Sequence, residues 1–281
     1  MIFVQTKKEM DETIKLLKKT SEKISLVPTM GNLHEGHLSL IDLAKKHSSK
    51  VIVSIFVNPL QFGENEDFDQ YPRTLEQDKQ KLIAKKCDLL FFPKSEKEIF
   101  PDLQAIKKIK SGKLGNILCG KKRPGHFDGV LTVVHQLFSL IKPDIAVFGA
   151  KDYQQQILIK NMSNNFFPKI EIKVGPIIRD KDGLALSSRN TYLTKKEKEV
   201  APLFFKSLKK GIKYFQKNNE LNFIKKEVKN MLNKKGIEVD YLEIRDIHLN
   251  TLDNSNIGSK KIFLGSIRLG KTKLIDNIEF F

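Results

Sequence analysis

The first 175 residues alternate short apolar runs with segments of helical periodicity, and this alternation constrains the fold more than any other feature. The expected strands are 24–29, 51–57, 88–92, 144–148 and 170–174, and helical patterns lie between them at 38–44, 73–86, 130–141 and 152–164. Strands that alternate with helices form a parallel sheet with right-handed crossovers. Ligands bind beyond the carboxyl ends of such strands, so motifs that directly follow a strand are the first candidates for chemistry.

The rest of the chain has a different pattern, with helices first and strands afterwards. We expect a lysine-rich helix 194–216 capped by Thr194, a second helix 221–235, and strands at 237–244, 261–269 and 273–278. We place the domain boundary between the two patterns near Gly175-Pro176. The predicted fold class is therefore α/β: a Rossmann-like parallel sheet with helices on both faces over 1–176, and a smaller C-terminal α+β domain over 177–281.

The net charge of +17 comes from 50 Lys and Arg residues against 33 Asp and Glu residues. Only six of the basic residues are arginines, and the chain is also rich in Asn and Ile, which is typical of a biased codon usage. Arginine is the usual reader of base edges and phosphates. We therefore expect no nucleic-acid partner, and we interpret the lysine-rich stretch 206–235 as a solvated helix face.

No apolar run approaches the ~20 residues that span a bilayer, so we expect no membrane partner. The first residues show no pattern of a secretory signal, which predicts a cytoplasmic protein. Cys87 and Cys119 are too few for a disulfide framework and too isolated for a zinc cluster.

The strongest motif is Pro-Thr-Met-Gly-Asn-Leu-His-Glu-Gly-His-Leu at 28–38, between a strand and a helix. A helix N-terminus offers unpaired N–H groups and partial positive charge, which suit a phosphate. His34 and His37 could both donate to one phosphate there, although capping or solvated histidines explain the bare spacing equally well. A zinc protease is disfavoured because its histidines are four residues apart on one helix.

Two further motifs follow strands. Asn58 and Gln61 follow the strand 51–57 and could orient a small polar substrate, although Asn-Pro is also a common turn. Lys151, Asp152 and Gln155 follow the strand 144–148, where Lys151 could face an anion and Asp152 could simply cap the next helix.

Two polar loops complete the set of motifs. The segment 179–190 carries two serines and Arg189, which suit phosphate binding but also an interdomain linker. The segment 123–129 places Arg123, His126 and Asp128 in a glycine-rich loop, a weak signal by itself.

Taken in order, the segments PTMGNLHEGH, IFVNPLQFG, YPRTLEQD, RPGHFDGV, FGAKDYQQ and DGLALSSRN closely resemble the pantoate–β-alanine ligases, or pantothenate synthetases. The resemblance spans roughly 26–194, and the tail agrees in length and character. This family belongs to the nucleotidylyltransferase superfamily with the HIGH motif. It implies ligation of pantoate to β-alanine through a pantoyl adenylate, with ATP as substrate, Mg²⁺ as cofactor, AMP and diphosphate as products, and a homodimer.

The resemblance also implies an ATP site, which we expect to be lined by Met30, Gly31, Asn32, Leu33, His34, Glu35, Gly36, His37, Gly149, Ala150, Lys151, Asp152, Ile178, Leu186, Ser187, Ser188 and Arg189. His34, His37 and Lys151 are the expected catalytic contacts to phosphate, with His37 as the proton donor. Leu186–Arg189 match the family's counterpart of the KMSKS loop, which closes on the β,γ-phosphates, and Ile178 matches a contact on the adenine side. Ala150 stands where many relatives have a glutamate, at a position where only the backbone is needed.

For the other substrates, Gln61 and Gln155 match the glutamines that hold pantoate, and Gln61 also matches a position near β-alanine. Arg123 resembles a site-lining arginine, and Asp78 resembles an acidic position near Mg²⁺.

Three other functions are compatible with parts of the sequence. A related nucleotidylyltransferase would share the histidines and the Ser/Arg loop, but it would not need Gln61 and Gln155. A nucleic-acid-binding protein would account for the charge, and its affinity would fall steeply with salt. A metal hydrolase would rest on His34 and His37 alone.

Overall fold

The computed structural model describes residues 1–20, 22–64, 66–103, 105–218, 220–252 and 258–281. They form two compact units. The first unit is Met1–Ala150 together with Gln154–Pro176, and the second is Ile177–Phe281 together with Lys151–Tyr153. Lys151 is thus grouped with the second unit, although it lies two residues after the end of a strand of the first.

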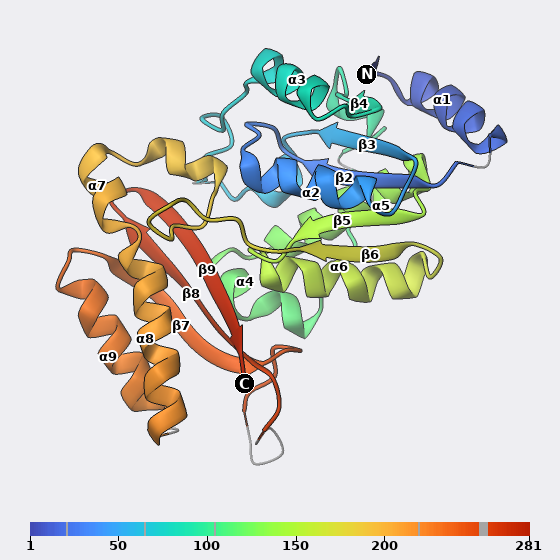
Figure 1. Ribbon diagram of the computed structural model, residues 1–281. Coiled ribbons are helices and arrows are strands. Elements are labelled where there is room, and N and C mark those ends of the chain that lie inside the picture. Colours follow the sequence, from blue (N-terminus) through green and yellow to red (C-terminus); the bar gives the residue numbers. More distant parts are fainter. Residues whose placement is uncertain (21, 65, 104, 219, 253–257) are drawn as a thin grey trace. The chain divides into compact units, whose positions relative to one another are not determined.

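A parallel sheet forms the centre of the first unit (Figure 1). Its described strands are β1 (Ile2–Val4), β2 (Ile24–Thr29), β3 (Lys50–Ile55), β4 (Leu89–Phe91), β5 (Ile145–Gly149) and β6 (Glu171–Gly175), in the spatial order β1-β4-β3-β2-β5-β6. The chain adds β3 and β4 on one side of β2 and then returns to the other side with β5. The topology therefore reverses between β2 and β5, which is where an open α/β sheet binds its ligands.

Helices cover both faces of this sheet, which confirms the predicted fold class. They are α1 (Lys7–Lys19), α2 (Glu35–Lys45), α3 (Leu75–Ala84), α4 (Leu118–Lys122), α5 (His126–Ile141) and α6 (Tyr153–Phe166), with short 3₁₀ turns η1 (Pro59–Gln61), η2 (Glu96–Glu98) and η3 (Lys113–Asn116). Successive strand residues face opposite sides. Leu26 of β2 packs with α1, α5 and α6, whereas Val27 packs with α2 and α3.

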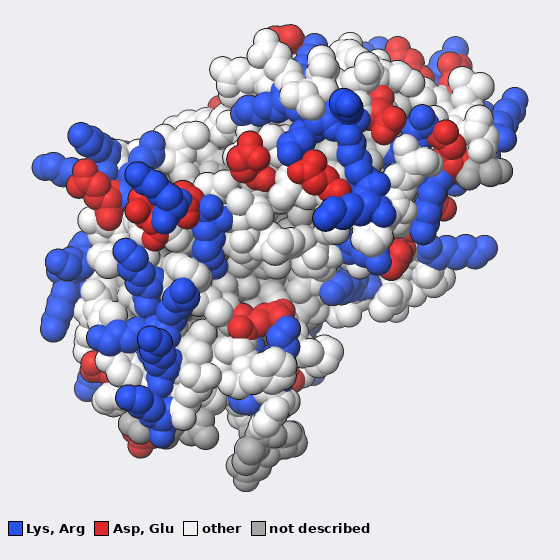
Figure 2. Space-filling model, in the orientation of Figure 1, with Lys and Arg blue, Asp and Glu red and all other residues white. Residues whose placement is uncertain are grey.

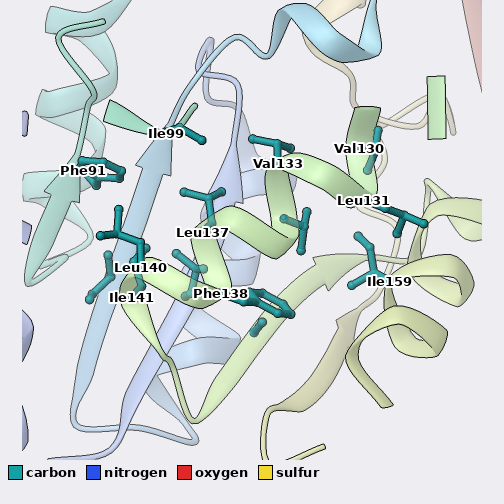
Figure 3. Packing of buried hydrophobic residues seen from close by; sticks show 14 of the residues in the cluster. Phe91, Ile99, Val130, Leu131, Val133, Leu137, Phe138, Leu140, Ile141 and Ile159 are labelled. Carbon is teal, nitrogen blue, oxygen red and sulfur yellow. The ribbon is translucent and has the colours of Figure 1, made fainter. Parts of the chain in front are cut away.

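The apolar face of α5 supplies much of the first of these two layers (Figure 3). Val130, Val133, Leu137 and Phe138 lie along this face and are almost completely buried. Their spacing of three and four residues is that of one side of a helix. This packing fixes the helix whose first residue, His126, belongs to the candidate site described below.

The second unit pairs three antiparallel strands with helices, as its sequence pattern predicts. The described elements are η4 (Ser188–Tyr192), α7 (Lys195–Val200), α8 (Leu203–Asn218), α9 (Leu221–Asn233), β7 (Glu238–Asp246), β8 (Lys261–Leu269) and β9 (Thr272–Phe280). Phe204 and Leu208 of α8, Val228 of α9 and Phe263 of β8 form the centre of its core. Strand β9 is an edge strand of this sheet.

The single long helix expected over 194–216 is wrong, because two helices, α7 and α8, occupy that range. Pro202 lies between them, and a proline cannot donate the backbone hydrogen bond that would continue α7. The predicted cap is confirmed: Thr194 and Glu197 form a reciprocal capping box at the start of α7.

The lysine-rich stretch is helical with one solvated face, as expected. Residues 195–235 contain 13 lysines and four glutamates. On α8, Lys206, Lys209 and Lys213 are exposed, whereas Leu208 and Ile212 are buried. Figure 2 shows basic side chains spread widely over one face of the molecule. Among the described helices, none is both long and apolar enough for a membrane span.

Candidate active site

The loop between β2 and α2 is held in an unusual backbone conformation by a buried carboxylate. Gly31 and Asn32 both have positive φ angles, of 83° and 48°. Asp78 of α3 is completely buried and accepts the backbone N–H groups of Asn32 and Leu33, each at 2.8 Å. A Cβ atom at Gly31 would lie 3.1 Å from the Ile55 side chain, so the loop has little space for a larger residue.

The hydrogen bonds of Asp78 therefore differ from those that we expected around a Mg²⁺ ligand. Both of its carboxylate oxygens accept backbone N–H groups, and the Thr74 hydroxyl also donates to it at 3.2 Å. Occupied oxygens inside the protein are poorly placed to coordinate a metal ion. In this structure Asp78 fixes the loop that carries the histidines.

His34 and His37 lie side by side at the N-terminus of α2, with ring centroids 4.1 Å apart. The Nδ1 atom of His34 accepts the N–H of Gly36 at 3.1 Å, and the Nδ1 atom of His37 accepts the N–H of His34 at 3.4 Å. Because a neutral imidazole carries one proton, each ring then carries it on Nε2. Capping and a proton on Nε2 are thus compatible, because Nδ1 caps the helix and Nε2 carries the N–H.

Gln61 lies in η1, just beyond the carboxyl end of β3, and its amide is oriented by two neighbours. Its Oε1 accepts from the amide of Asn58 at 3.0 Å, and its Nε2 donates to the sulfur of Met30 at 3.0 Å. Asn58 is itself buried, and it donates to Gly129 O and accepts from Leu60 N. Since Asn58 can donate only through its nitrogen, this network fixes which end of Gln61 is the acceptor.

The main chain of Gln61 is held by a second network that links Arg123, His126 and Glu66. The Nδ1 of His126 donates to Gln61 O at 2.7 Å, because a carbonyl can only accept, so Nε2 accepts from Arg123 at 2.9 Å. Arg123 also forms an ion pair with Glu66. Burial acts to raise the pKa of the Glu66 carboxyl, but the hydrogen bonds and charge of Arg123 hold that pKa below its ordinary value.

This second network adjusts the sequence-based expectations for two residues. Arg123 was expected to line the site, and the structure shows its guanidinium engaged with Glu66, His126 and the main chain of Gln61. His126 was not among the expected site residues. Its only local signal was the glycine-rich loop 123–129, because its partner Gln61 lies 65 residues away in the sequence.

Gln155 differs from the two glutamines beside it on α6. Gln154 is buried and donates to the carbonyls of Leu114 and Ile117, and Gln156 is also buried. Gln155 is only partly buried, and no hydrogen bond of its side chain is found among the described residues. Its amide is therefore available to a ligand of the first unit.

The second unit contains the other expected ATP contacts, which are Lys151, Asp152, Ile178 and Leu186–Arg189. Residues 179–185 form a short hairpin, in which Arg179 pairs with Ala185, and Leu186 N donates to Ile178 O at 2.9 Å. Ser187 accepts from Arg189 N at the start of η4. The remaining expected contacts, Met30–His37 and Gly149–Ala150, belong to the first unit, as do Gln61, Gln155, Arg123 and Asp78.

No group of three or more His, Cys, Asp or Glu side chains in the described parts of the chain has an arrangement that could hold a metal ion. The side chains of the first unit described above offer hydrogen bonds. Two imidazole N–H donors lie at a helix N-terminus, and the oriented amides of Asn58 and Gln61 lie beyond the carboxyl end of β3. Such preplaced donors suit a phosphate and a small polar substrate.

Comparisons with known proteins point to one enzyme family. The family model for pantoate-beta-alanine ligase matches residues 2–279. Pantothenate synthetase from Neisseria meningitidis is 46% identical over 265 residues, which cover 93% of this chain and 94% of that protein. Pantothenate synthetase from Caldicellulosiruptor bescii is 43% identical over 282 residues, which cover 99% of this chain and 98% of that protein.

Two solved structures are similar over the whole chain. Pantothenate synthetase from Thermus thermophilus has a TM-score of 0.89 at 36% identity and covers 99% of both chains. Pantoate-beta-alanine ligase from Francisella tularensis, complexed with beta-gamma ATP and beta-alanine, has a TM-score of 0.81 at 38% identity, over 99% of this chain and 97% of that one. The chain therefore belongs to the pantoate-beta-alanine ligase family, whose enzymes join pantoate to β-alanine at the expense of ATP.

Proposed function

We propose that this chain carries out the family's reaction in two steps, with pantoyl adenylate as the intermediate. In the first step a carboxylate oxygen of pantoate attacks the α-phosphorus of ATP, and the bond to the β-phosphate breaks, so that diphosphate leaves. In the second step the uncharged amine of β-alanine attacks the acyl carbon. The bond from that carbon to the adenylate oxygen then breaks and releases AMP, and the amine loses a proton as the amide forms.

The observation that carries this proposal is the pair of Nε2–H donors of His34 and His37 at the N-terminus of α2. Negative charge shifts onto the α- and β-phosphates while diphosphate departs. Donors that are already oriented toward this charge stabilise the transition state without reorganising. We assign proton donation to His37, and we assign phosphate contact to His34 and Lys151.

Pantoate would be held by the side-chain amides of Gln61 and Gln155. Gln61 is oriented by Asn58 and Met30, and its main chain is fixed by Arg123 and His126, so its position is defined before substrate binds. Preorganisation of this kind lowers the entropy cost of aligning a carboxylate with phosphorus. We place β-alanine close to Gln61. The Francisella ligase, complexed with a nucleotide and beta-alanine, supports assigning both of these substrates.

For ATP we propose contacts from Met30–His37, Gly149–Asp152, Ile178 and Leu186–Arg189, with the last segment on the β,γ-phosphates. Mg²⁺ would be held chiefly by these phosphates, as is usual for this ion. The carboxylate of Asp78 does not fit as a direct ligand, because both of its oxygens accept backbone N–H groups.

Two further proposals concern the state of the protein. The resemblance to the family supports a homodimer, which light scattering of the purified protein would measure. The use of ATP in a biosynthetic reaction supports a cytoplasmic location.

Isotope transfer tests the adenylate directly. Pantoate labelled with ¹⁸O in both carboxylate oxygens should deliver one labelled oxygen to AMP and keep the other in the amide carbonyl of the product. In the absence of β-alanine, labelled diphosphate should exchange into ATP only when pantoate is present. Label in inorganic phosphate, together with formation of ADP, would instead indicate an acyl phosphate and would overturn the proposed route.

A further inference from the structure

Two neighbouring residues of β9, Asp276 and Asn277, contact Lys151 and the Arg179 hairpin that leads into Leu186. Asn277 Nδ2 donates to the main-chain oxygen of Lys151 at 3.0 Å. The carboxylate of Asp276 accepts two hydrogen bonds from the guanidinium of Arg179, at 2.6 and 2.8 Å. Both β9 side chains are almost completely buried, so these contacts are shielded from competing water.

The Lys151 segment is attached to the second unit at more than one point. Besides the bond from Asn277, the hydroxyl of Tyr153 donates to Ile247 O at 3.0 Å. Burial raises the pKa of that hydroxyl, and the carboxylate of Glu279, also on β9, acts in the same direction. The second unit therefore holds the residue before Asp152 by its main chain and the residue after it by its side chain.

The Arg179 hairpin is attached to the same strand. Arg179 donates to Gly183 O at 3.1 Å and to Asn277 O at 3.4 Å, and its guanidinium lies 3.6 Å from the ring centre of Phe205. A planar guanidinium that makes a bidentate bond and also stacks on a ring has little freedom. The hairpin that it anchors leads directly into Leu186.

Charge also links the two segments at Asp276. Burial raises the pKa of the Asp276 carboxyl, and both the Arg179 guanidinium and the Lys151 ammonium act against this rise. Asp276 therefore interacts electrostatically with both segments. Asn277 donates from its side chain to the main chain of Lys151, and its main-chain oxygen accepts a hydrogen bond from Arg179.

We propose that Asp276 and Asn277 are positioning residues for ATP, which hold Lys151 and the Leu186–Arg189 segment in register from a single strand. This inference rests on the proposed phosphate contacts of those two segments. One rigid strand that holds both would set the spacing between their donors. Such spacing matters because displacements of about 1 Å at groups that contact a reacting phosphate are costly.

The first test is Asn277→Ala, with Asn230→Ala on the exposed surface of α9 as the matched control. Loss of the single hydrogen bond to Lys151 should raise the KM for ATP about five- to tenfold. The KM for β-alanine should stay unchanged, because β-alanine does not contact the triphosphate. The control should keep both values. Thermal unfolding should show that both variants are folded at the assay temperature. A folded Asn277→Ala protein with an unaltered KM for ATP would overturn the inference.

A double-mutant cycle with Lys151→Ala separates positioning from general weakening of the fold. If Asn277 acts through Lys151, the Asn277→Ala change should have little further effect on ATP use once the Lys151 side chain is gone. Independent effects that multiply would contradict a positioning role. If Lys151→Ala alone leaves ATP use unchanged while AMP is still formed, the proposed phosphate contact fails. The Asn277 part of the inference then fails with it, but the ligase function stands.

Arg179→Lys tests the hairpin that leads into Leu186. This change keeps a positive charge opposite the buried carboxylate of Asp276. Lysine keeps the charge but loses the bidentate fork. The KM for ATP should again rise several-fold, on the scale of one lost charge-assisted hydrogen bond. Arg268→Lys is the matched control, since Arg268 is exposed and pairs with Asp240. Equal kinetics for the two variants would show that the Arg179–Asp276 pair does not position the loop.

Discussion

His34 and His37 use their two ring nitrogens for different tasks. The Nδ1 atoms accept backbone N–H groups and fix the rings, and this leaves the proton on Nε2. The sequence indicated that these side chains meet at a helix N-terminus. It could not indicate the tautomer, which depends on the rotamer of each ring.

The tautomer gives a prediction for two replacements of His37. The nitrogen of a glutamine side chain can take the place of Nε2, whereas asparagine can replace only the Nδ1 acceptor. His37→Asn should therefore lower kcat about 10²- to 10³-fold, as for a lost transition-state donor, while His37→Gln should retain more activity. Steady-state kinetics of both proteins would measure this. Equal rates in the two variants would contradict donation from Nε2.

A second prediction at the level of single residues concerns Asp78. Its carboxylate is buried and accepts hydrogen bonds from the loop between β2 and α2. Asp78→Asn turns one acceptor into a donor that faces a backbone N–H. This should cost about 1–3 kcal/mol of unfolding free energy and should slow turnover. The Mg²⁺ concentration that gives half-maximal rate at fixed ATP should stay unchanged. A selective rise in that concentration, with stability preserved, would instead identify Asp78 as a metal ligand.

The ion pair between Glu66 and Arg123 should make the stability of the protein depend on pH. Its folded-state pKa is lowered, so the stabilisation from its pair with Arg123 is present above the ordinary value of 4.5 and is lost as the pH falls through the folded-state value. Glu66→Gln should therefore flatten the loss of thermal stability as the pH falls from 4.5 through the folded-state pKa. The exposed Glu76→Gln, measured over the same pH series, should leave the curve unchanged. Parallel curves of thermal stability against pH for the unmodified protein and both variants would contradict the assigned pKa direction.

At the scale of elements, packing between α5 and η1 sets the position of Gln61. A Cβ atom at Gly129 of α5 would lie 2.0 Å from Leu60 O and 2.7 Å from Gln61 N. Gly129→Ala should therefore push η1 away, lower stability by ~1–3 kcal/mol, and raise the KM for pantoate more than the KM for ATP. Gly63→Ala is the control, because its nearest neighbour would be 3.7 Å away. Retained pantoate affinity in Gly129→Ala would show that η1 is not rigidly held.

The elements that the sequence predicted well are those with a dense local pattern. The run 24–29 is a strand with the predicted bounds, because its residues are mostly apolar and the two sides of a parallel sheet are both buried. The short β1 was missed, since three residues carry no measurable period. The following α1 was missed as well, although Thr6 and Glu9 form a capping box that the sequence displays.

The site shows the same division between local and distant contacts. Motifs next to strands indicated His34, His37 and Gln61, because topology places the carboxyl ends of neighbouring strands together. The sequence could not predict three contacts: Asp78 with Leu33, His126 with Gln61, and Asp276 with Arg179. These partners lie about 45, 65 and 97 residues away in the sequence, and only the folded structure brings them together.

At the scale of the whole molecule, the proposed chemistry is divided between two units. The first unit carries His34, His37, Gln61 and Gln155. The second unit carries Lys151 and the Leu186–Arg189 segment. The net charge of +17 is spread unevenly along the chain, since residues 195–235 have nine more lysines than glutamates (13 against four). Eleven of these lysines lie in α7, α8 and α9, and none of the 13 belongs to a segment that is expected to contact substrate.

Product analysis with each component omitted in turn tests the central claim most directly. The protein would be incubated with ATP, Mg²⁺, pantoate and β-alanine, and nucleotides and acids would be separated and identified. We predict that AMP and diphosphate appear in equal amounts with pantothenate, and only when both organic substrates are present. The absence of AMP from the complete mixture, or a nucleotide joined to an alcohol substrate, would contradict the account and favour a related nucleotidylyltransferase.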